Sequence, residues 1–275
     1  MTAANPATGM PAPPPSARKW TGGRITGHVL MALWIVAGAY LLYYLSINVA
    51  SPFVQKYWGE YVDGFVVTVQ IVAASLLIGA ALSVPIAFAR NSQWRIFRWP
   101  AYGYVYFFRG TPLLAQTFLI YYGAGSFRAE LQSIGLWWFF REAIYCIIFA
   151  FSLNTSAYQA EILRGAILNV PRGQWEGGMA LGLPRTVIFF KIILPQALMV
   201  ALRPYGNEII LMIKGSAIAS IVTVFDLMGE TRRAFSRSYD FQAYIWAAVL
   251  YLLIVEMLRR IWDRLETRLT RHLKR

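Results

Sequence analysis

The stretch EGGMALGLPRTVIFFKIILP, at residues 176–195, interrupts a chain that is otherwise dominated by apolar runs. It combines glycine and proline with charges of both signs, and it lies between two of those runs. The chain has 275 residues, of which 57% are hydrophobic and 14% are charged, and its mean hydropathy is +0.47. This composition excludes a single soluble domain of ordinary surface and predicts a polytopic membrane protein.

Apolar runs long enough to cross about 30 Å of hydrocarbon, roughly 20 residues each, recur along the chain. The third run is interrupted by Arg109, Gly110 and Pro112, so we expect its membrane portion to begin near Thr111. The predicted spans are 28–50, 63–89, 101–124, 143–163, 205–225 and 241–261. The predicted fold class is therefore all-α, a polytopic transmembrane helical bundle.

Positive charge is concentrated on one side of the predicted spans. The segments before the first span, after the second, from Arg164 to Arg203 and from Arg259 onward hold 18 lysines and arginines, against 6 in the alternate segments. Because cytoplasmic loops carry the excess of positive charge, both termini are predicted to be cytoplasmic. The same distribution explains the net charge of +13 without nucleic acid, which we do not expect as a partner.

The ends of the chain suggest additions to the main apolar domain. A cleaved signal peptide is the alternative for the first span, but that run is longer than a signal's apolar region, which favours a retained anchor. The single cysteine, Cys146, excludes an intramolecular disulfide, and two distant histidines make a metal site improbable. The expected organisation is a disordered Pro/Ala-rich cytoplasmic tail at 1–27, an extra transmembrane helix at 28–50, a transmembrane domain at 51–262 and a basic cytoplasmic tail at 263–275.

The long connection contains a predicted short helix. Residues 172–181 can form a helical turn or two, and Gly182 with Pro184 then ends it. Small side chains on this helix would let another backbone approach closely, while Trp175 and Met179 could fill an apolar groove. We interpret the segment as a docking helix outside the bilayer; an ordinary solvated loop is the alternative.

The same connection resembles the EAA signature of ABC-importer permeases. Its pattern reads Glu176-Gly177-Gly178, then Gly182, then Ile192-x-Leu194-Pro195, with Gly-Gly where the family usually has Ala-Ala. The stretches at 107–123, 153–176 and 205–227 are similar to the polar-amino-acid branch of that family, above all to its histidine/basic-amino-acid permease subunit and the opine-transport relatives. The resemblance covers roughly residues 52–275.

This resemblance implies a type I ABC importer permease, with a five-helix core plus one extra N-terminal span, in the bacterial inner membrane. The implied cargo is polar, preferably basic, amino acids or their derivatives, of the histidine, arginine, lysine or opine class. The implied partners are a second permease subunit in a heterodimer, two cytoplasmic ABC ATPases, a periplasmic solute-binding protein and membrane lipid. The residues expected to couple to the ATPase are Glu176, Gly177, Gly178, Met179, Ala180, Leu181 and Gly182.

ATP and magnesium are expected on the partner ATPase, and no cofactor is expected on this chain. A P-loop needs lysine after glycine, and no lysine here follows a glycine, so the chain is predicted to be non-catalytic. A secondary transporter or channel working without an ATPase is the alternative function, but it calls for inverted repeats or an ion relay, and the sequence shows neither. A membrane enzyme is disfavoured because no nucleophile, metal or paired-carboxylate arrangement is evident.

Polar side chains inside the predicted spans are the candidates for a substrate pathway, because such groups are costly at bilayer depth. In the fourth span an amide, a hydroxyl and a carboxylate share one helix face that suits a cationic group. Pairing of Glu161 with Arg164 is the structural alternative. In the fifth span a small and polar stripe suits either a dimer seam or the pathway. The candidates are Asn154, Tyr158, Glu161, Glu208, Met212 and Ser216.

Two basic features remain. Arg109, before Thr111 and Pro112, is expected to mark a kinked start of a helix, with a binding role as the alternative. The arginines at 260, 264, 268 and 271 form a helical stripe suited to anionic lipid headgroups of the cytoplasmic leaflet.

Overall fold

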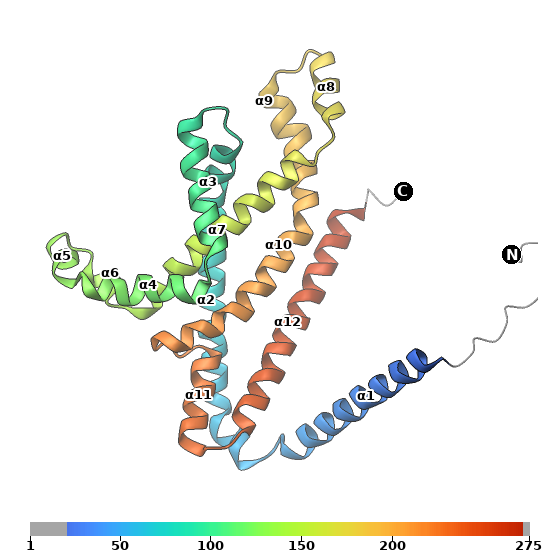
Figure 1. The fold of residues 1–275 in the computed structure, drawn as a ribbon, viewed down its shortest axis with the longest axis vertical. Coiled ribbons are helices and arrows are strands. Elements are labelled where there is room, and N and C mark those ends of the chain that lie inside the picture. Colours follow the sequence, from blue (N-terminus) through green and yellow to red (C-terminus); the bar gives the residue numbers. More distant parts are fainter. Residues whose placement is uncertain (1–20, 272–275) are drawn as a thin grey trace, which may run out of the picture. The chain divides into compact units, whose positions relative to one another are not determined.

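The apolar runs form helices in the computed structural model, which describes residues 21–271 (Figure 1). Within that range the regular structure is entirely helical. The α-helices are α1 (Gly22–Asn48), α2 (Pro52–Asn91), α3 (Arg95–Gly110), α4 (Leu113–Ser126), α5 (Arg128–Ser133), α6 (Trp137–Phe140), α7 (Ala143–Leu168), α8 (Arg172–Ala180), α9 (Arg185–Val187), α10 (Leu194–Ser216), α11 (Leu227–Ser238) and α12 (Gln242–Leu269). A π-helical turn at Ile188–Ile193 joins α9 to α10, and a 3₁₀ turn at Ala217–Val222 follows α10.

The chain divides into two units, residues 1–56 and 57–275, and α1 belongs to the first. Helix α1 is a 27-residue apolar helix with no buried residue. It begins at Gly22, so the prediction of a disordered tail up to residue 27 was wrong for its last part. The amides of Arg24 and Ile25 donate to the Thr21 carbonyl at 3.0 and 3.1 Å and close a helical turn ahead of the apolar run. The rest of that predicted tail lies outside the described residues.

Within residues 21–271, three helical stretches are long and apolar enough to cross a membrane, namely Gly22–Asn48, Pro52–Asn91 and Arg185–Val222. They contain most of the first, second and fifth predicted spans. The fifth begins well before residue 205, where the sequence placed its start. The π-helical turn accommodates Pro195, which has no amide hydrogen to donate to the preceding turn, so the helix continues through it.

The third predicted span is divided between two helices. Helix α3 ends at Gly110 and α4 begins at Leu113, as expected from the proline between them. The fourth predicted span lies within α7, which has 26 residues, and the sixth lies within α12, which has 28 residues, except for its first residue, Phe241.

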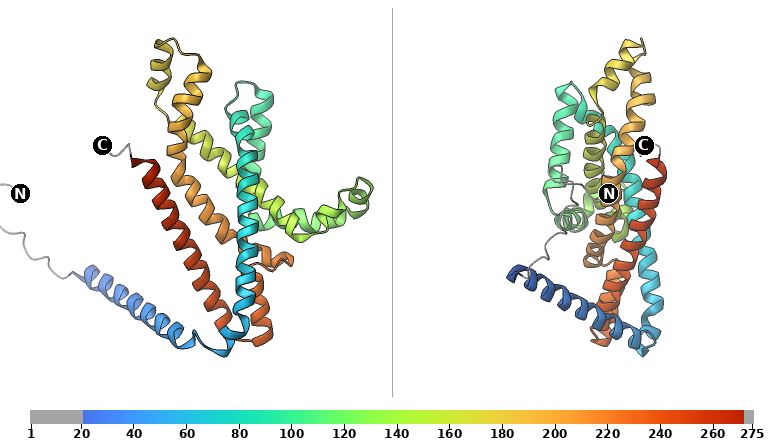
Figure 2. Two further views of the ribbon diagram at one scale, coloured as in Figure 1. Left: turned by 180° about the vertical axis from the view of Figure 1, so that it is seen from behind. Right: turned by 90° about the vertical axis from the view of Figure 1, so that its right-hand side faces the viewer.

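Helix α7 is the central element of the second unit, and residues of α2, α3, α4 and α10 pack against it (Figure 2). Phe151 of α7, Ile71 of α2 and Met212 of α10 belong to one apolar cluster, and none is more than 3% exposed. Gly79 of α2 lies so close to Thr155 of α7 that a β-carbon would overlap the threonine methyl group. Because lipid tails are as apolar as leucine, such close packing, rather than escape from water, holds membrane helices together.

Helix α11 lies beside the first half of α2 in both views (Figures 1 and 2). The carboxylate of Asp226 caps α11 by accepting a hydrogen bond from the Gly229 amide at 2.9 Å. The amide of Leu227 donates to the hydroxyl of Thr68 on α2 at 3.0 Å. Gly64, one turn before Thr68, lies directly against the backbone of Asp226. The start of α11 is therefore fixed to α2 by backbone contact.

Helix α12 continues to Leu269, so residues 263–269 of the segment predicted as a basic tail are helical, as the expected helical stripe of arginines requires. Its Trp262 lies over Gly206 of α10, and the indole nitrogen donates to the Leu202 carbonyl at 2.8 Å. This contact, together with leucine, arginine and glutamate residues that favour helix, extends α12 beyond the apolar run. The end of the predicted tail lies outside the described residues.

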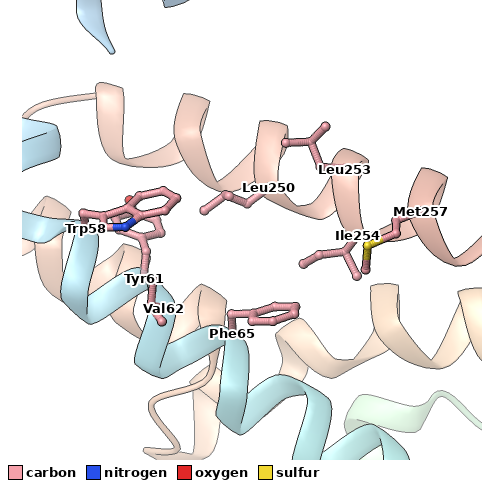
Figure 3. Close-up of a pocket in the computed structure, with 8 residues that line it drawn as sticks. All are labelled: Trp58, Tyr61, Val62, Phe65, Leu250, Leu253, Ile254 and Met257. Atoms are coloured by element: carbon pink, nitrogen blue, oxygen red, sulfur yellow. The ribbon is translucent and has the colours of Figure 1, made fainter. Parts of the chain in front are cut away.

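Helices α2 and α12 border an apolar groove of about 230 Å³ (Figure 3). Side chains from the two helices line opposite sides of it: Trp58, Tyr61, Val62, Phe65, Leu250, Leu253, Ile254 and Met257. The lining carries no charged group, so this groove offers nothing that would bind a polar solute.

Replacing Gly64 by alanine tests the backbone contact between α2 and α11. The new β-carbon would lie 2.9 Å from the Asp226 carbonyl oxygen, and backbone cannot move aside cheaply. We expect Gly64→Ala to lower the stability of the protein by about 1–3 kcal/mol, the usual penalty of overpacking. The measurement is the thermal unfolding temperature in detergent. Gly59→Ala on the same helix, where the β-carbon meets open space, is the control and should unfold no earlier than wild type. Equal unfolding temperatures would contradict the contact.

Candidate functional site

Helix α8 and the short α9 lie at one end of the second unit, the same end as the connection between α2 and α3 (Figure 1). The sequence placed a docking helix at 172–181, and α8 occupies these positions. Gly182 follows with a left-handed φ of +72°. Its amide donates to the Met179 carbonyl at 2.9 Å, and the Leu183 amide donates to the Gly178 carbonyl at 3.1 Å. This pair of bonds is a Schellman motif, which needs a residue such as glycine that tolerates positive φ.

One face of α8 is anchored to the helix that follows it. Gly178 is buried, and a β-carbon there would lie 2.8 Å from the Ile188 side chain. The Trp175 ring lies 6.4 Å from the ring of Phe189, centroid to centroid. The remaining residues expected to contact an ATPase are exposed: Glu176, Gly177, Met179, Ala180, Leu181 and Gly182. The arrangement is a rigidly attached helix that presents a free outer face.

Asn154 lies in a buried hydrogen-bond network rather than on an open face. Its amide nitrogen donates to the Phe108 carbonyl and to the side-chain oxygen of Gln116, both at 2.9 Å. Gln116 in turn donates to the hydroxyl of Thr111 at 2.7 Å. These bonds bridge the break between α3 and α4, where the helical ladder is interrupted. The amide of Asn154 is therefore already hydrogen-bonded within this chain, and its role in the structure is to stabilise the break between α3 and α4.

Glu161 is held by two arginines. The side chain of Arg90 on α2 donates to one carboxylate oxygen at 2.9 Å, and that of Arg164 donates to the other at 2.8 Å. The pairing with Arg164, which the sequence left as the alternative, is present. The carboxylate of Glu161 is thus already neutralised. The amide of Asn154, the hydroxyl of Tyr158 and this carboxylate therefore do not converge on one open helix face as predicted.

Tyr158 and Glu161 do line a common space. Two adjoining cavities, of about 310 and 460 Å³, share Tyr158, Glu161 and Arg109 in their walls. Arg109, at the end of α3, places its guanidinium 5.1 Å from the centre of the Tyr158 ring. Cavities of this size are in the range that binds small ligands, roughly 300–1,000 Å³.

The candidates on α10 are buried inside the chain. Glu208, Met212 and Ser216 are 5%, 3% and 0% exposed. The Glu208 carboxylate accepts a hydrogen bond from the Thr155 hydroxyl of α7 at 2.7 Å. None of the three lines either of the cavities described above.

Sequence reasoning missed the residues that complete these networks. Gln116 carried a signal, since it is a polar residue inside an apolar run just after a helix break. Arg90 and Thr155 did not, because their partners lie far away in the sequence. Within residues 21–271, no three histidine, cysteine, aspartate or glutamate side chains cluster as a metal site would require.

The sequence profile described as binding-protein-dependent transport system inner membrane component matches residues 79–271. The chain belongs to this family. The permease is 42% identical to the nopaline transport system permease protein NocM of Agrobacterium fabrum over 208 residues, which are 75% of this chain and 86% of that protein. It is 37% identical to the histidine/lysine/arginine/ornithine transport system permease protein HisM of Salmonella typhimurium over 227 residues, 80% of this chain and 97% of that protein.

A solved structure of an amino acid ABC transporter with histidines has the same fold as the permease. The match has a TM-score of 0.70 at 31% sequence identity and covers 78% of this chain and 95% of that one. Both the family resemblance and the helical-bundle fold class predicted from the sequence are confirmed.

The contact between α8 and Ile188 gives the two glycines of the EAA segment different roles. Gly177 has open space around it, so Gly177→Ala should stabilise α8 by up to about 1 kcal/mol. Gly178→Ala would press on Ile188, and we expect it to lower the unfolding temperature of the purified permease. Adding Ile188→Val should restore part of the loss in the second variant. If both alanine variants behave alike, the contact is not the reason for glycine at 178.

Neutralising Glu161 tests whether its role is structural. In Glu161→Gln the side chains of Arg90 and Arg164, which are 14% and 28% exposed, lose their carboxylate partner. We expect a loss of about 1–3 kcal/mol in stability, the usual range for a poorly solvated donor left without its partner. The readout is thermal unfolding of the purified permease. Glu256→Gln, which removes an exposed carboxylate paired with Arg259 and Arg260, is the control and should leave unfolding unchanged. A stable Glu161→Gln protein with altered transport would favour the pathway role instead.

Proposed function

We propose that this permease is the membrane-spanning subunit of an ATP-driven importer of basic amino acids or opines. The observation that carries the proposal is helix α8, which is anchored on one face through Gly178 and Trp175 and exposed on the other. Such a helix can transmit motion, since its inner face is fixed to the long helix that begins at α9. The names of the relatives, which carry nopaline or histidine, lysine, arginine and ornithine, support the cargo class.

The proposed division of labour places ATP and magnesium on a separate ATPase. Two such ATPases, a second permease subunit in a heterodimer and a periplasmic solute-binding protein complete the complex. This chain is then a non-catalytic subunit that forms half of the translocation pathway. Its resemblance to the permease of a solved amino acid ABC transporter supports this composition.

The proposed orientation has both termini and α8 on the cytoplasmic side of the bacterial inner membrane. The excess of lysine and arginine in the α8 connection and in the C-terminal segment supports it. Closure of the ATPases on ATP would move α8, and α8 would move α10 through the π-helical turn at Ile188–Ile193. The pathway would open outward to accept cargo from the binding protein, and hydrolysis would reset it inward.

Two substitutions on the exposed side of α8 test this coupling. Glu176→Lys reverses a charge on the docking face, and Gly182→Val places a β-branched residue at a φ of +72°. We expect each variant to lower the ratio of solute uptake to ATP hydrolysis in proteoliposomes by at least about tenfold, while the subunit stays in the membrane. A factor of ten corresponds to the loss of a contact worth about 1.4 kcal/mol. Gly173→Ala, on the same helix with open space around it, is the control.

Copurification supplies the decisive outcome. The proposal requires an ATPase that purifies with this chain and whose hydrolysis is stimulated by a loaded binding protein. Wild-type uptake in both variants, or solute accumulation by the isolated chain without any ATPase, would refute it and favour a secondary transporter.

A further inference from the structure

Arg109 lies at the meeting point of the two cavities that contain Tyr158 in their walls. It lies in the last turn of α3, before the break at Pro112, and its exposed side chain lines the two cavities that adjoin at Tyr158. The guanidinium lies 5.1 Å from the Tyr158 ring centre, within the range of a cation–π contact. The Tyr158 hydroxyl lies 3.5 Å from the Arg109 carbonyl oxygen, so both the ring and the hydroxyl of Tyr158 are close to Arg109.

Among the charged residues that line the cavities, Arg109 carries a positive charge that no neighbouring carboxylate pairs with. The carboxylate of Glu161 is already neutralised by Arg90 and Arg164. Among residues 21–271, Arg109 forms no ion pair. Glu208 is close enough to attract it electrostatically, but that carboxylate is 5% exposed and accepts a hydrogen bond from Thr155. The surface of the cavity is therefore positive.

An exposed guanidinium without an ion-pair partner is free to meet an anion. The contact with the tyrosine ring holds the guanidinium beside the cavities and leaves N–H donors available to a ligand. These donors match a carboxylate, which accepts two parallel hydrogen bonds from arginine. The free carboxylate that a cation would need is not present on this helix face, because Glu161 is already paired with Arg90 and Arg164.

We propose that Arg109 binds the carboxylate of the transported amino acid or opine, with Tyr158 as the residue that positions its guanidinium. The inference rests on the proposed function, because it takes the cavities to be part of the translocation pathway. Every amino acid and every opine carries at least one carboxylate, so Arg109 would recognise the feature common to the cargo class. The variable side chain of the cargo would then lie in the rest of the cavity.

The test measures ligand binding to the purified membrane complex in lipid nanodiscs without the solute-binding protein, so that the specificity of that protein does not enter. The probes are L-arginine and nopaline, each compared with agmatine, which is arginine without its carboxylate. Wild type should bind at least one of the two carboxylate ligands about tenfold or more tightly than agmatine, since loss of a charge-assisted bidentate contact is worth at least this factor. Arg109→Gln should abolish that preference by weakening the carboxylate ligand, and it should not weaken agmatine.

Two further variants separate binding from folding. Arg109→Lys keeps the charge without the planar fork and should retain part of the preference. Arg95→Gln, an exposed arginine at the opposite end of α3, should retain all of it. The proposal is overturned if wild type shows no preference for a carboxylate ligand, or if Arg109→Gln weakens all three ligands equally or none. Because binding is measured without ATP, failure here is distinct from failure of ATPase coupling, which copurification and uptake report.

Discussion

Close backbone contact at glycine is the constraint on which the arrangement of this permease depends. In lipid, apolar side chains gain little by leaving one apolar environment for another, so helices must be positioned by tight packing and by hydrogen bonds. Gly79 brings α2 against α7, Gly64 brings it against the start of α11, and Gly206 receives Trp262 of α12. At each of these positions a β-carbon would collide with its neighbour, so the helices that carry the functional residues cannot shift independently.

The break between α3 and α4 shows how the same constraint creates a site. Irregular backbone at membrane depth needs protein partners for its polar groups, and Gln116 with Asn154 provides them. Arg109, in the last turn of α3 before the break, lies against Tyr158, where the two cavities adjoin. Polar residues that look like one functional stripe in the sequence therefore divide into structural partners and cavity walls.

In the coupling segment, α8 is positioned by its C-terminal cap and by one packing contact. A Schellman motif at Gly182 ends α8, and the contact of Gly178 with Ile188 fixes its direction. Packing therefore explains why the second residue of the Gly-Gly pair, Gly178, is glycine rather than the alanine usual in the family. At the first position of the pair nothing in the structure requires glycine.

The sequence by itself determined the helical fold class, the family, the helix break at Pro112 and the short helix before Gly182, because runs of apolar residues and glycine or proline act locally on the backbone. It did not determine which polar side chains pair. Glu161 meets Arg90 and Glu208 meets Thr155 across large separations in the chain, and only the packing of α2 and α10 on α7 brings them together. Local spacing places residues on a common helix face, whereas the neighbouring helices decide whether that face is open, buried or already neutralised.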